Sequence, residues 1–136
     1  MIKPIMRDVM FLSQPSEEAT KADQQVITDL VDTLNAHLDG CVGMAANMIG
    51  VRKRIIVVRM GPISMPMVNP VIVAKSGEYE TEEGCLSLLG VRKCKRWKSI
   101  DVSYQDAVFL PRRQKYSGWI AQIIQHEIDH CNGVII

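Results

Sequence analysis

The sequence predicts an α+β protein with a mostly antiparallel sheet. Two observations carry this prediction: helical periodicity occurs only near the two ends of the chain, and several extended segments lie between them. A repeating βαβ protein would instead alternate strands and helices along its whole length. The 136 residues are expected to form a single domain over residues 1–136, because a domain typically holds about 150 residues.

The first helix is predicted by apolar side chains that recur every three or four residues. Thr20 and Asp23 resemble a capping box at its start. Gly40, just past Asp39, suits the left-handed residue that follows a helix end. The apolar positions are Val26, Ile27, Leu30, Val31, Leu34 and Leu38.

The strands are expected in the middle of the chain. Residues 54–59 contain the run Ile-Ile-Val-Val, which is typical of a buried strand. Residues 67–74 form a second strand in which Pro70 requires an edge or a bulge. Residues 78–88 are expected to be extended, and alternating apolar and polar residues predict a further strand over 99–105.

The C-terminal part is predicted to contain a turn and a helix. Residues 111–114 read Pro-Arg-Arg-Gln, and the proline favours a turn there. The last helix is expected to begin at Ser117 and run to about Cys131, with Gly133 helping to end it.

The composition excludes several classes of protein. With 47% hydrophobic residues, 23% charged residues and a net charge of +1, the chain is not typical of a disordered protein. The longest uncharged stretch, residues 60–74, is shorter than the ~20 apolar residues of a membrane span. No signal peptide is apparent, so a cytoplasmic location is expected. The near-zero net charge favours neither DNA nor a membrane as a partner.

The segment His-Glu-Ile-Asp-His at 126–130 carries the strongest chemical signal. His126 and His130 are four residues apart on the predicted helix, so both rings can reach one metal ion. Glu127 is then placed as a general base for water bound to that metal.

A helical wheel supports this interpretation. Glu127 falls in the middle of the apolar arc, the two histidines fall at its edge, and Gln122, Gln125 and Asp129 lie on the opposite face. A buried carboxylate without a partner is costly, and a metal or bound water would supply one. The arc itself contains Trp119, Ile120, Ile123, Ile124, Ile128 and Cys131.

A third metal ligand is required, because catalytic zinc-type sites usually have three protein ligands and one open position. Cys85 is the preferred candidate, since a glycine flanks it and Glu83 is near. From chemistry alone, Cys41 and Cys131 stay open as alternatives, and His37 on the first helix is a weaker one.

Three segments, in this order, resemble the signature motifs of peptide deformylases. They are GMAANMIG at 43–50, EGCLS at 83–87 and QHEIDH at 125–130. The resemblance covers essentially the whole chain and implies the α+β fold of that family, with antiparallel sheets around an interior helix that carries HExxH. It also implies an enzyme, a metal-dependent hydrolase that removes the N-formyl group from the N-terminal formyl-methionine of nascent bacterial polypeptides.

The same resemblance implies the roles of the catalytic residues. Cys85, His126 and His130 would bind a divalent metal, natively Fe²⁺, with Zn²⁺ or Ni²⁺ as substitutes. Glu127 would take a proton from the metal-bound water and deliver it to the departing amine. The backbone N–H of Leu86 would help to hold the tetrahedral oxyanion.

The resemblance also implies how the substrate is held. Glu83 would orient the pocket, and Arg92 matches a family arginine that helps to hold the peptide. Gly43 and Met48 belong to the first motif and would border the substrate. The candidates for lining the pocket of the methionine side chain are Val42, Trp119 and Ile123.

The first and second motifs depart from the family pattern. Met48 occupies the position of a glutamine whose amide donates to the oxyanion, and a thioether cannot donate a hydrogen bond. The neighbouring Asn47 carries an amide that could substitute if the backbone shifts by one residue. Cys41 replaces a glycine, and residues 88–90 replace a segment with proline. The alternative function is therefore a deformylase-like metal-binding paralogue with weak or altered activity.

The segment RKCKRWK at 92–98 suggests a third possibility, a module that binds nucleic acid or the ribosome. It contains five basic residues, but a strand would divide them between its two faces. The net charge of +1 is also low for a nucleic-acid-binding domain. We therefore expect a solvated strand, with at most a weak and transient contact with the ribosome.

Overall fold

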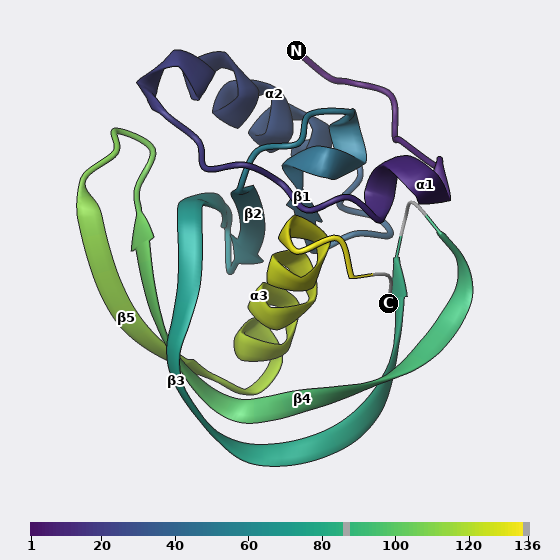
Figure 1. Cartoon of the computed structure of the whole chain (residues 1–136), viewed down its shortest axis with the longest axis vertical. Coiled ribbons are helices and arrows are strands. Elements are labelled where there is room, and N and C mark those ends of the chain that lie inside the picture. Colours follow the sequence, from purple (N-terminus) through teal and green to yellow (C-terminus); the bar gives the residue numbers. More distant parts are fainter. Residues whose placement is uncertain (86–87, 135–136) are drawn as a thin grey trace.

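The computed structural model describes residues 1–85 and 88–134. Helical and extended segments follow one another as predicted, with α-helices towards the ends and strands between them (Figure 1). In chain order the elements are α1 (Val9–Leu12), the 3₁₀ turn η1 (Lys21–Asp23), α2 (Gln24–Asn35), β1 (Gly43–Ala45), the 3₁₀ turn η2 (Ala46–Ile49), β2 (Ile55–Met60), β3 (Ile63–Cys85), β4 (Leu88–Gln105), β5 (Pro111–Ser117) and α3 (Gly118–Cys131).

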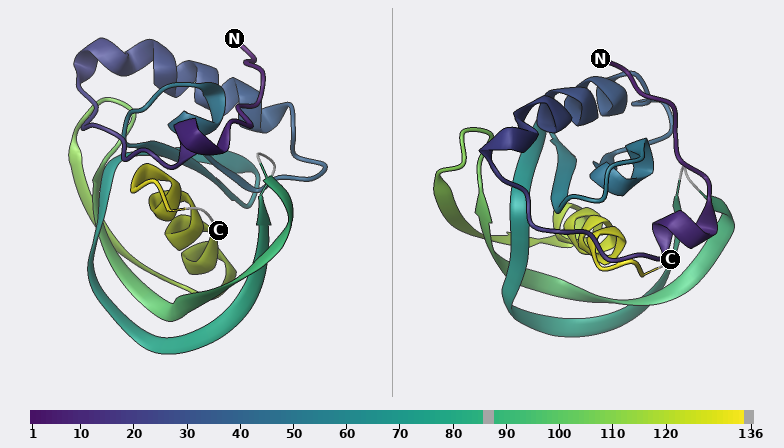
Figure 2. Two further views of the ribbon diagram at one scale, coloured as in Figure 1. Left: turned by 45° about the vertical axis from the view of Figure 1, so that its right-hand side comes forward. Right: turned by 45° about the horizontal axis from the view of Figure 1, so that its top comes forward.

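The strands form one antiparallel sheet in the order β1-β2-β3-β4-β5. The long strands β3 and β4 curve around α3, while α2 lies beyond β1 and β2 on the other side (Figure 2). The register of β3 shifts between Val68 and Val71, which confirms the irregularity expected at Pro70. The segment predicted over 67–74 and residues 78–85 of the segment predicted over 78–88 belong to this single strand, whereas Leu88 begins β4 and residues 86–87 lie outside the described residues.

Strand β2 separates two hydrophobic clusters and thereby places α3 in the interior. Ile56 and Val58 belong to the cluster around α3, whereas Ile55 and Val57 belong to the cluster under α2. Successive side chains of a strand point to opposite faces, so both faces of β2 are buried. This explains why the segment reads as a continuous apolar run rather than an alternating one.

Helix α2 begins as predicted and ends earlier than predicted. Thr20 and Asp23 form the capping box, at the start of η1, which leads directly into α2. The helix stops at Asn35, and Gly40 does not adopt a left-handed conformation. The reason is local: the backbone N–H of His37 bonds to Leu34 instead of Thr33. This tightens the last turn.

The turn expected at residues 111–114 is wrong, because these residues are the first part of β5. The chain reverses instead at residues 106–110. There the Asp106 carboxylate accepts hydrogen bonds from the backbone of Val108 and Leu110, and Phe109 has a positive φ of 65°. The aspartate therefore determines this turn rather than the proline that follows it.

No helix among the described residues is both long and apolar enough to cross a membrane.

Candidate metal centre

Helix α3 presents its chemical groups to the interior. His126, Glu127 and His130 are 7%, 4% and 1% exposed. The centroids of the two imidazole rings are 5.0 Å apart, as expected for a pair separated by one helical turn. The sheet covers the helix on several sides, which is why polar residues in this segment are buried at all.

Cys85, at the end of β3, completes a cluster of three potential ligands. One ligand atom each of Cys85, His126 and His130 lies within 4.8 Å of the others, and the Cys85 Sγ is 3.2 Å from the His130 Nε2. A tetrahedral zinc-type site holds its ligand atoms roughly 3.3–3.8 Å apart. The cluster therefore fits one divalent ion. Among the described residues the geometry favours Cys85 over Cys41 and Cys131, which do not join this cluster.

The Glu83 carboxylate orients His126. Its Oε1 lies 2.8 Å from the His126 Nδ1, which leaves the Nε2 of that ring for a metal. Arg96 binds the same carboxylate with two hydrogen bonds of 2.6 and 2.9 Å and reaches Asp129 at 2.7 Å. Burial would raise the pKa of Glu83, but hydrogen bonds from His126 and Arg96 outweigh it and lower that pKa to about 2.

Arg96 and Asp129 are site-supporting residues that the sequence does not reveal. Arg96 lies in the basic segment predicted to be solvated, yet it is only 3% exposed. Asp129 was expected on the solvent face of α3. Because β4 passes along that face, the two side chains meet in an ion pair. The pairing depends on strand curvature, which leaves no local mark in the sequence.

Glu127 combines burial with an unpaired oxygen. Its Oε1 is buried and has no hydrogen-bond partner among the described residues. Burial raises the pKa of Glu127 to about 7. Gly43 of β1 packs against it so closely that a Cβ there would lie 2.9 Å from the Glu127 Oε2 and 2.6 Å from the Ile123 Cγ2. The glycine therefore makes room for the carboxylate.

The two histidines differ in their electrostatics. Burial favours neutral His126, but the contact with Cys85 and the charge of Glu127 outweigh it and raise its pKa to about 10. Burial, together with the nearby His126, lowers the pKa of His130 to about 3. A metal takes the place of the His126 proton when it binds, because a ligating imidazole is deprotonated.

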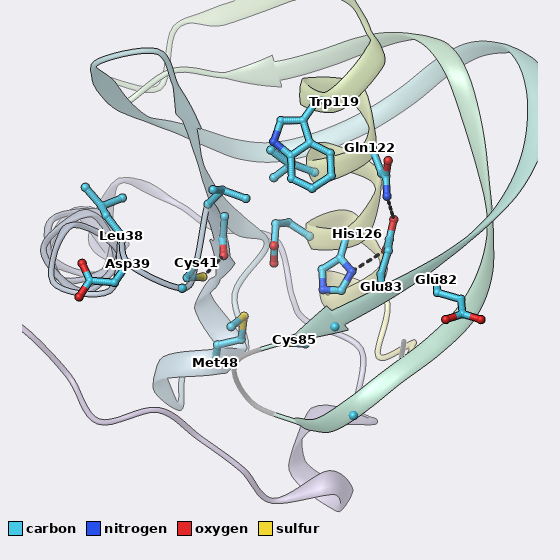
Figure 3. Close-up of a pocket in the computed structure, with 17 residues that line it drawn as sticks. Leu38, Asp39, Cys41, Met48, Glu82, Glu83, Cys85, Trp119, Gln122 and His126 are labelled. Atoms are coloured by element: carbon cyan, nitrogen blue, oxygen red, sulfur yellow. Dashed lines mark hydrogen bonds and ion pairs between the residues drawn. The ribbon is translucent and has the colours of Figure 1, made fainter.

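A cavity of about 660 Å³ opens onto this centre (Figure 3). Its walls include the predicted substrate residues Val42, Gly43, Met48 and Glu83. Arg92 is not among its described lining residues and lies on β4 opposite Glu83. Leu86 lies outside the described residues.

Besides His126 and Glu127, three other residues of α3 line the cavity. Ile123 is buried, whereas Trp119 is 62% exposed, although the wheel places it in the apolar arc. Gln122 also lines the cavity, in contrast to its expected place on the opposite face. Gln125 is buried as well, and its amide exchanges hydrogen bonds with the backbone of Trp97. The curved sheet encloses both sides of the helix, so a single polar face does not exist.

The first motif contributes a thioether and an amide that face different ways. Met48 is 1% exposed, lines the cavity and accepts a hydrogen bond of 3.4 Å from the Ala45 backbone through its sulfur. The Asn47 amide donates to the backbone oxygen of His130 at 2.9 Å. Asn47 is thus engaged with the end of α3, and it does not take the place of the missing glutamine.

The basic residues of segment 92–98 face an acidic strand. Lys93 and Lys95 are exposed on β4 and pair in register with Glu82 and Glu80 of β3. Lys95 also lies 3.8 Å from the Glu78 carboxylate. The division of charge between the two strand faces is confirmed, and the exposed part is balanced by carboxylates.

Comparisons with known proteins agree with the resemblance found in the sequence. The polypeptide deformylase family model matches residues 3–136. A peptide deformylase of Clostridium beijerinckii is 59% identical over the full length of both chains, and one of Thermoanaerobacter pseudethanolicus is 36% identical over 91% of this chain and 79% of its own.

Solved structures point the same way. A peptide deformylase from Legionella pneumophila superposes with a TM-score of 0.89 at 32% identity, covering 99% of this chain and 83% of its own. The Thermotoga maritima enzyme gives a TM-score of 0.89 at 30% identity, covering 99% and 95%. The predicted fold is confirmed, and the chain belongs to the polypeptide deformylase family.

Proposed function

We propose that the cavity beside Cys85, His126 and His130 is the active site of this enzyme. The chain is a hydrolase of the deformylase family, and its reaction removes the N-formyl group from nascent polypeptides. One observation supports this site above the others: three ligand atoms converge beside the Glu127 carboxylate, whose buried Oε1 has no partner in the part of the chain that the structure describes.

The three ligands suit a divalent metal, and the family is one of metalloenzymes. We infer that the native ion is Fe²⁺ and that Zn²⁺ or Ni²⁺ can replace it, since two imidazoles and a thiolate suit all these ions. When bound, such an ion lowers the pKa of water and polarises the formyl carbonyl. Cys85, His126 and His130 would hold it, and Glu83 keeps the His126 ring turned towards the ion.

Glu127 is the proton carrier in this proposal. Its carboxylate accepts a proton from the attacking water and returns it to the departing amine. Gly43 leaves the carboxylate in place, because any larger residue there would collide with it.

The remaining roles concern the substrate. Leu86 supplies a backbone N–H for the oxyanion, Arg92 holds the peptide, and Met48 borders the formyl group. The proposed pocket for the formyl-methionine side chain is lined by Val42, Trp119 and Ile123.

The alternative of a weak or altered paralogue is not favoured. Identity of 59% over the full length of a peptide deformylase supports the enzyme itself, despite Met48.

We further propose a cytoplasmic location and a weak, transient contact with the ribosome. The exposed Lys93 and Lys95 could reach phosphates, although the neighbouring carboxylates limit the attraction. Binding of ribosomes should then weaken steeply as salt increases, and binding that ignores salt would exclude phosphate contacts.

The direct test is deformylation of formyl-Met-Ala-Ser by protein that is prepared anaerobically and loaded with Fe²⁺. We expect turnover of the formyl peptide and none of acetyl-Met-Ala-Ser, with zinc-loaded protein as a comparison. A loaded protein that leaves the formyl peptide intact would contradict the proposed function.

A further inference from the structure

The Glu83 carboxylate has a full set of hydrogen-bond partners, and two of them, Gln122 and His126, line the cavity. A carboxylate offers about four acceptor positions on its two oxygens. Oε1 interacts with Arg96 Nη2 and His126 Nδ1, and Oε2 accepts from Arg96 Nε and from Gln122 Nε2 at 2.8 Å. Gln122 therefore supplies the fourth donor.

Gln122 is placed for this contact by the helix. It precedes His126 by one turn of α3, so both side chains lie on the same face. Figure 3 shows the Gln122 amide and the His126 ring reaching the Glu83 carboxylate from neighbouring positions. Gln122 and His126 both line the cavity, whereas Arg96 is not among its described lining residues.

Tyr79 provides the second hydrogen bond of the Gln122 amide. The Tyr79 hydroxyl donates to the Gln122 Oε1 at 3.2 Å. The amide oxygen thus points towards Tyr79, and the NH₂ group points towards Glu83. An ionised carboxylate can only accept, so Glu83 fixes this orientation of the amide. The tyrosine holds the amide in place by satisfying its remaining oxygen.

We infer that Gln122, held by Tyr79, is a positioning residue for the metal centre. It acts through Glu83, whose carboxylate fixes the orientation of the His126 ring. Gln122 is partly exposed in the cavity wall, and its two hydrogen bonds, from Tyr79 and to Glu83, account for the fixed position of its amide. This inference rests on the proposed metal ligands and adds the residue that keeps their support in place.

The test compares Gln122→Leu with Gln125→Leu. Both replace a buried or cavity-lining glutamine of α3 by an apolar residue of similar length, but Gln125 bonds to backbone groups of Trp97 and Ala121. We would titrate each metal-free protein with Co²⁺, recording the affinity and the visible absorption spectrum of the bound ion. The thermal midpoint of unfolding would be measured in parallel.

We expect Gln122→Leu to weaken Co²⁺ binding about tenfold and to alter the spectrum, as loss of a support residue does elsewhere. Gln125→Leu should lower the thermal midpoint and leave the spectrum unchanged. Tyr79→Phe should change the spectrum in the same direction as Gln122→Leu, by a smaller amount. Unchanged affinity and spectrum in Gln122→Leu, or equal changes in both glutamine variants, would overturn the inference.

A separate control distinguishes this inference from the metal site itself. Wild-type protein should bind one Co²⁺ and Cys85→Ala should bind none. If Cys85→Ala binds Co²⁺ normally, the ligand assignment is wrong. If it does not, while Gln122→Leu matches wild type, only the positioning role fails.

Discussion

The two walls of the cavity differ in the hydrogen-bonding groups that they carry. On the wall formed by β3 and α3, Glu83 is saturated by donors, and Arg96 is paired with two carboxylates. On the wall formed by β1 and η2, Met48 offers a thioether, which accepts a hydrogen bond from the Ala45 backbone and cannot donate one. The wall formed by β3 and α3 is thus organised by the protein's own hydrogen bonds. The wall formed by β1 and η2 offers few hydrogen-bond donors to a substrate.

The largest effect is expected for Cys85. If this residue is not needed for metal binding, the proposed contrast between the two cavity walls fails. Cys85→Ala should abolish stoichiometric Fe²⁺ or Zn²⁺ binding, because a divalent ion would lose its only thiolate among the three proposed ligands. Metal content after dialysis is the measurement. Cys41→Ala is the matched control, since this thiol lines the same cavity and should retain full metal content.

A Glu127 variant tests whether metal binding and proton transfer can be separated. Glu127→Gln should keep the metal and lower kcat by about 10²–10⁴-fold, because the amide cannot accept and return the proton. Single-turnover kinetics and metal analysis on the same sample measure both quantities. Substantial turnover in this variant would refute the assigned role as general base.

A Met48 variant tests whether the cavity wall formed by β1 and η2 lacks a hydrogen-bond donor for the oxyanion. In Met48→Gln the new oxygen can accept from the Ala45 backbone, as the sulfur does, and the NH₂ group can donate into the cavity. Because one donor to an oxyanion contributes about 10²–10³ in kcat elsewhere, we expect kcat to rise by up to about 10². An unchanged kcat would mean that the metal and the backbone suffice.

A Gly43 variant tests how closely β1 must pack against α3. Gly43→Ala would push a methyl group against Ile123 and Glu127, so we expect a loss of about 1–3 kcal/mol in the free energy of unfolding. Urea denaturation measures it. Gly40→Ala is the control, because a Cβ there meets no atom within 4 Å, and its stability should stay near that of wild type.

The sequence allowed much of this molecule to be predicted. The β2 run, the bulge at Pro70 and the last helix, expected from Ser117 and found over Gly118–Cys131, followed from periodicity and residue type. The interior position of that helix was implied by the family resemblance. The two histidines and Glu127 followed from their spacing on one helix. The choice of Cys85 over Cys41 did not follow from chemistry, because the third ligand comes from a distant strand and local patterns carry no distances.

What the sequence determined by itself is local: which residues form the helix with His126 and His130, and which segments are extended. Only the tertiary structure decided the environment of these groups. The curvature of β3 and β4 buried Arg96, paired it with Asp129 and brought Gln122 into the cavity wall. These contacts join residues 13 to 39 positions apart. Periodicity describes one element at a time, so it cannot specify which side of a helix a curved sheet will cover.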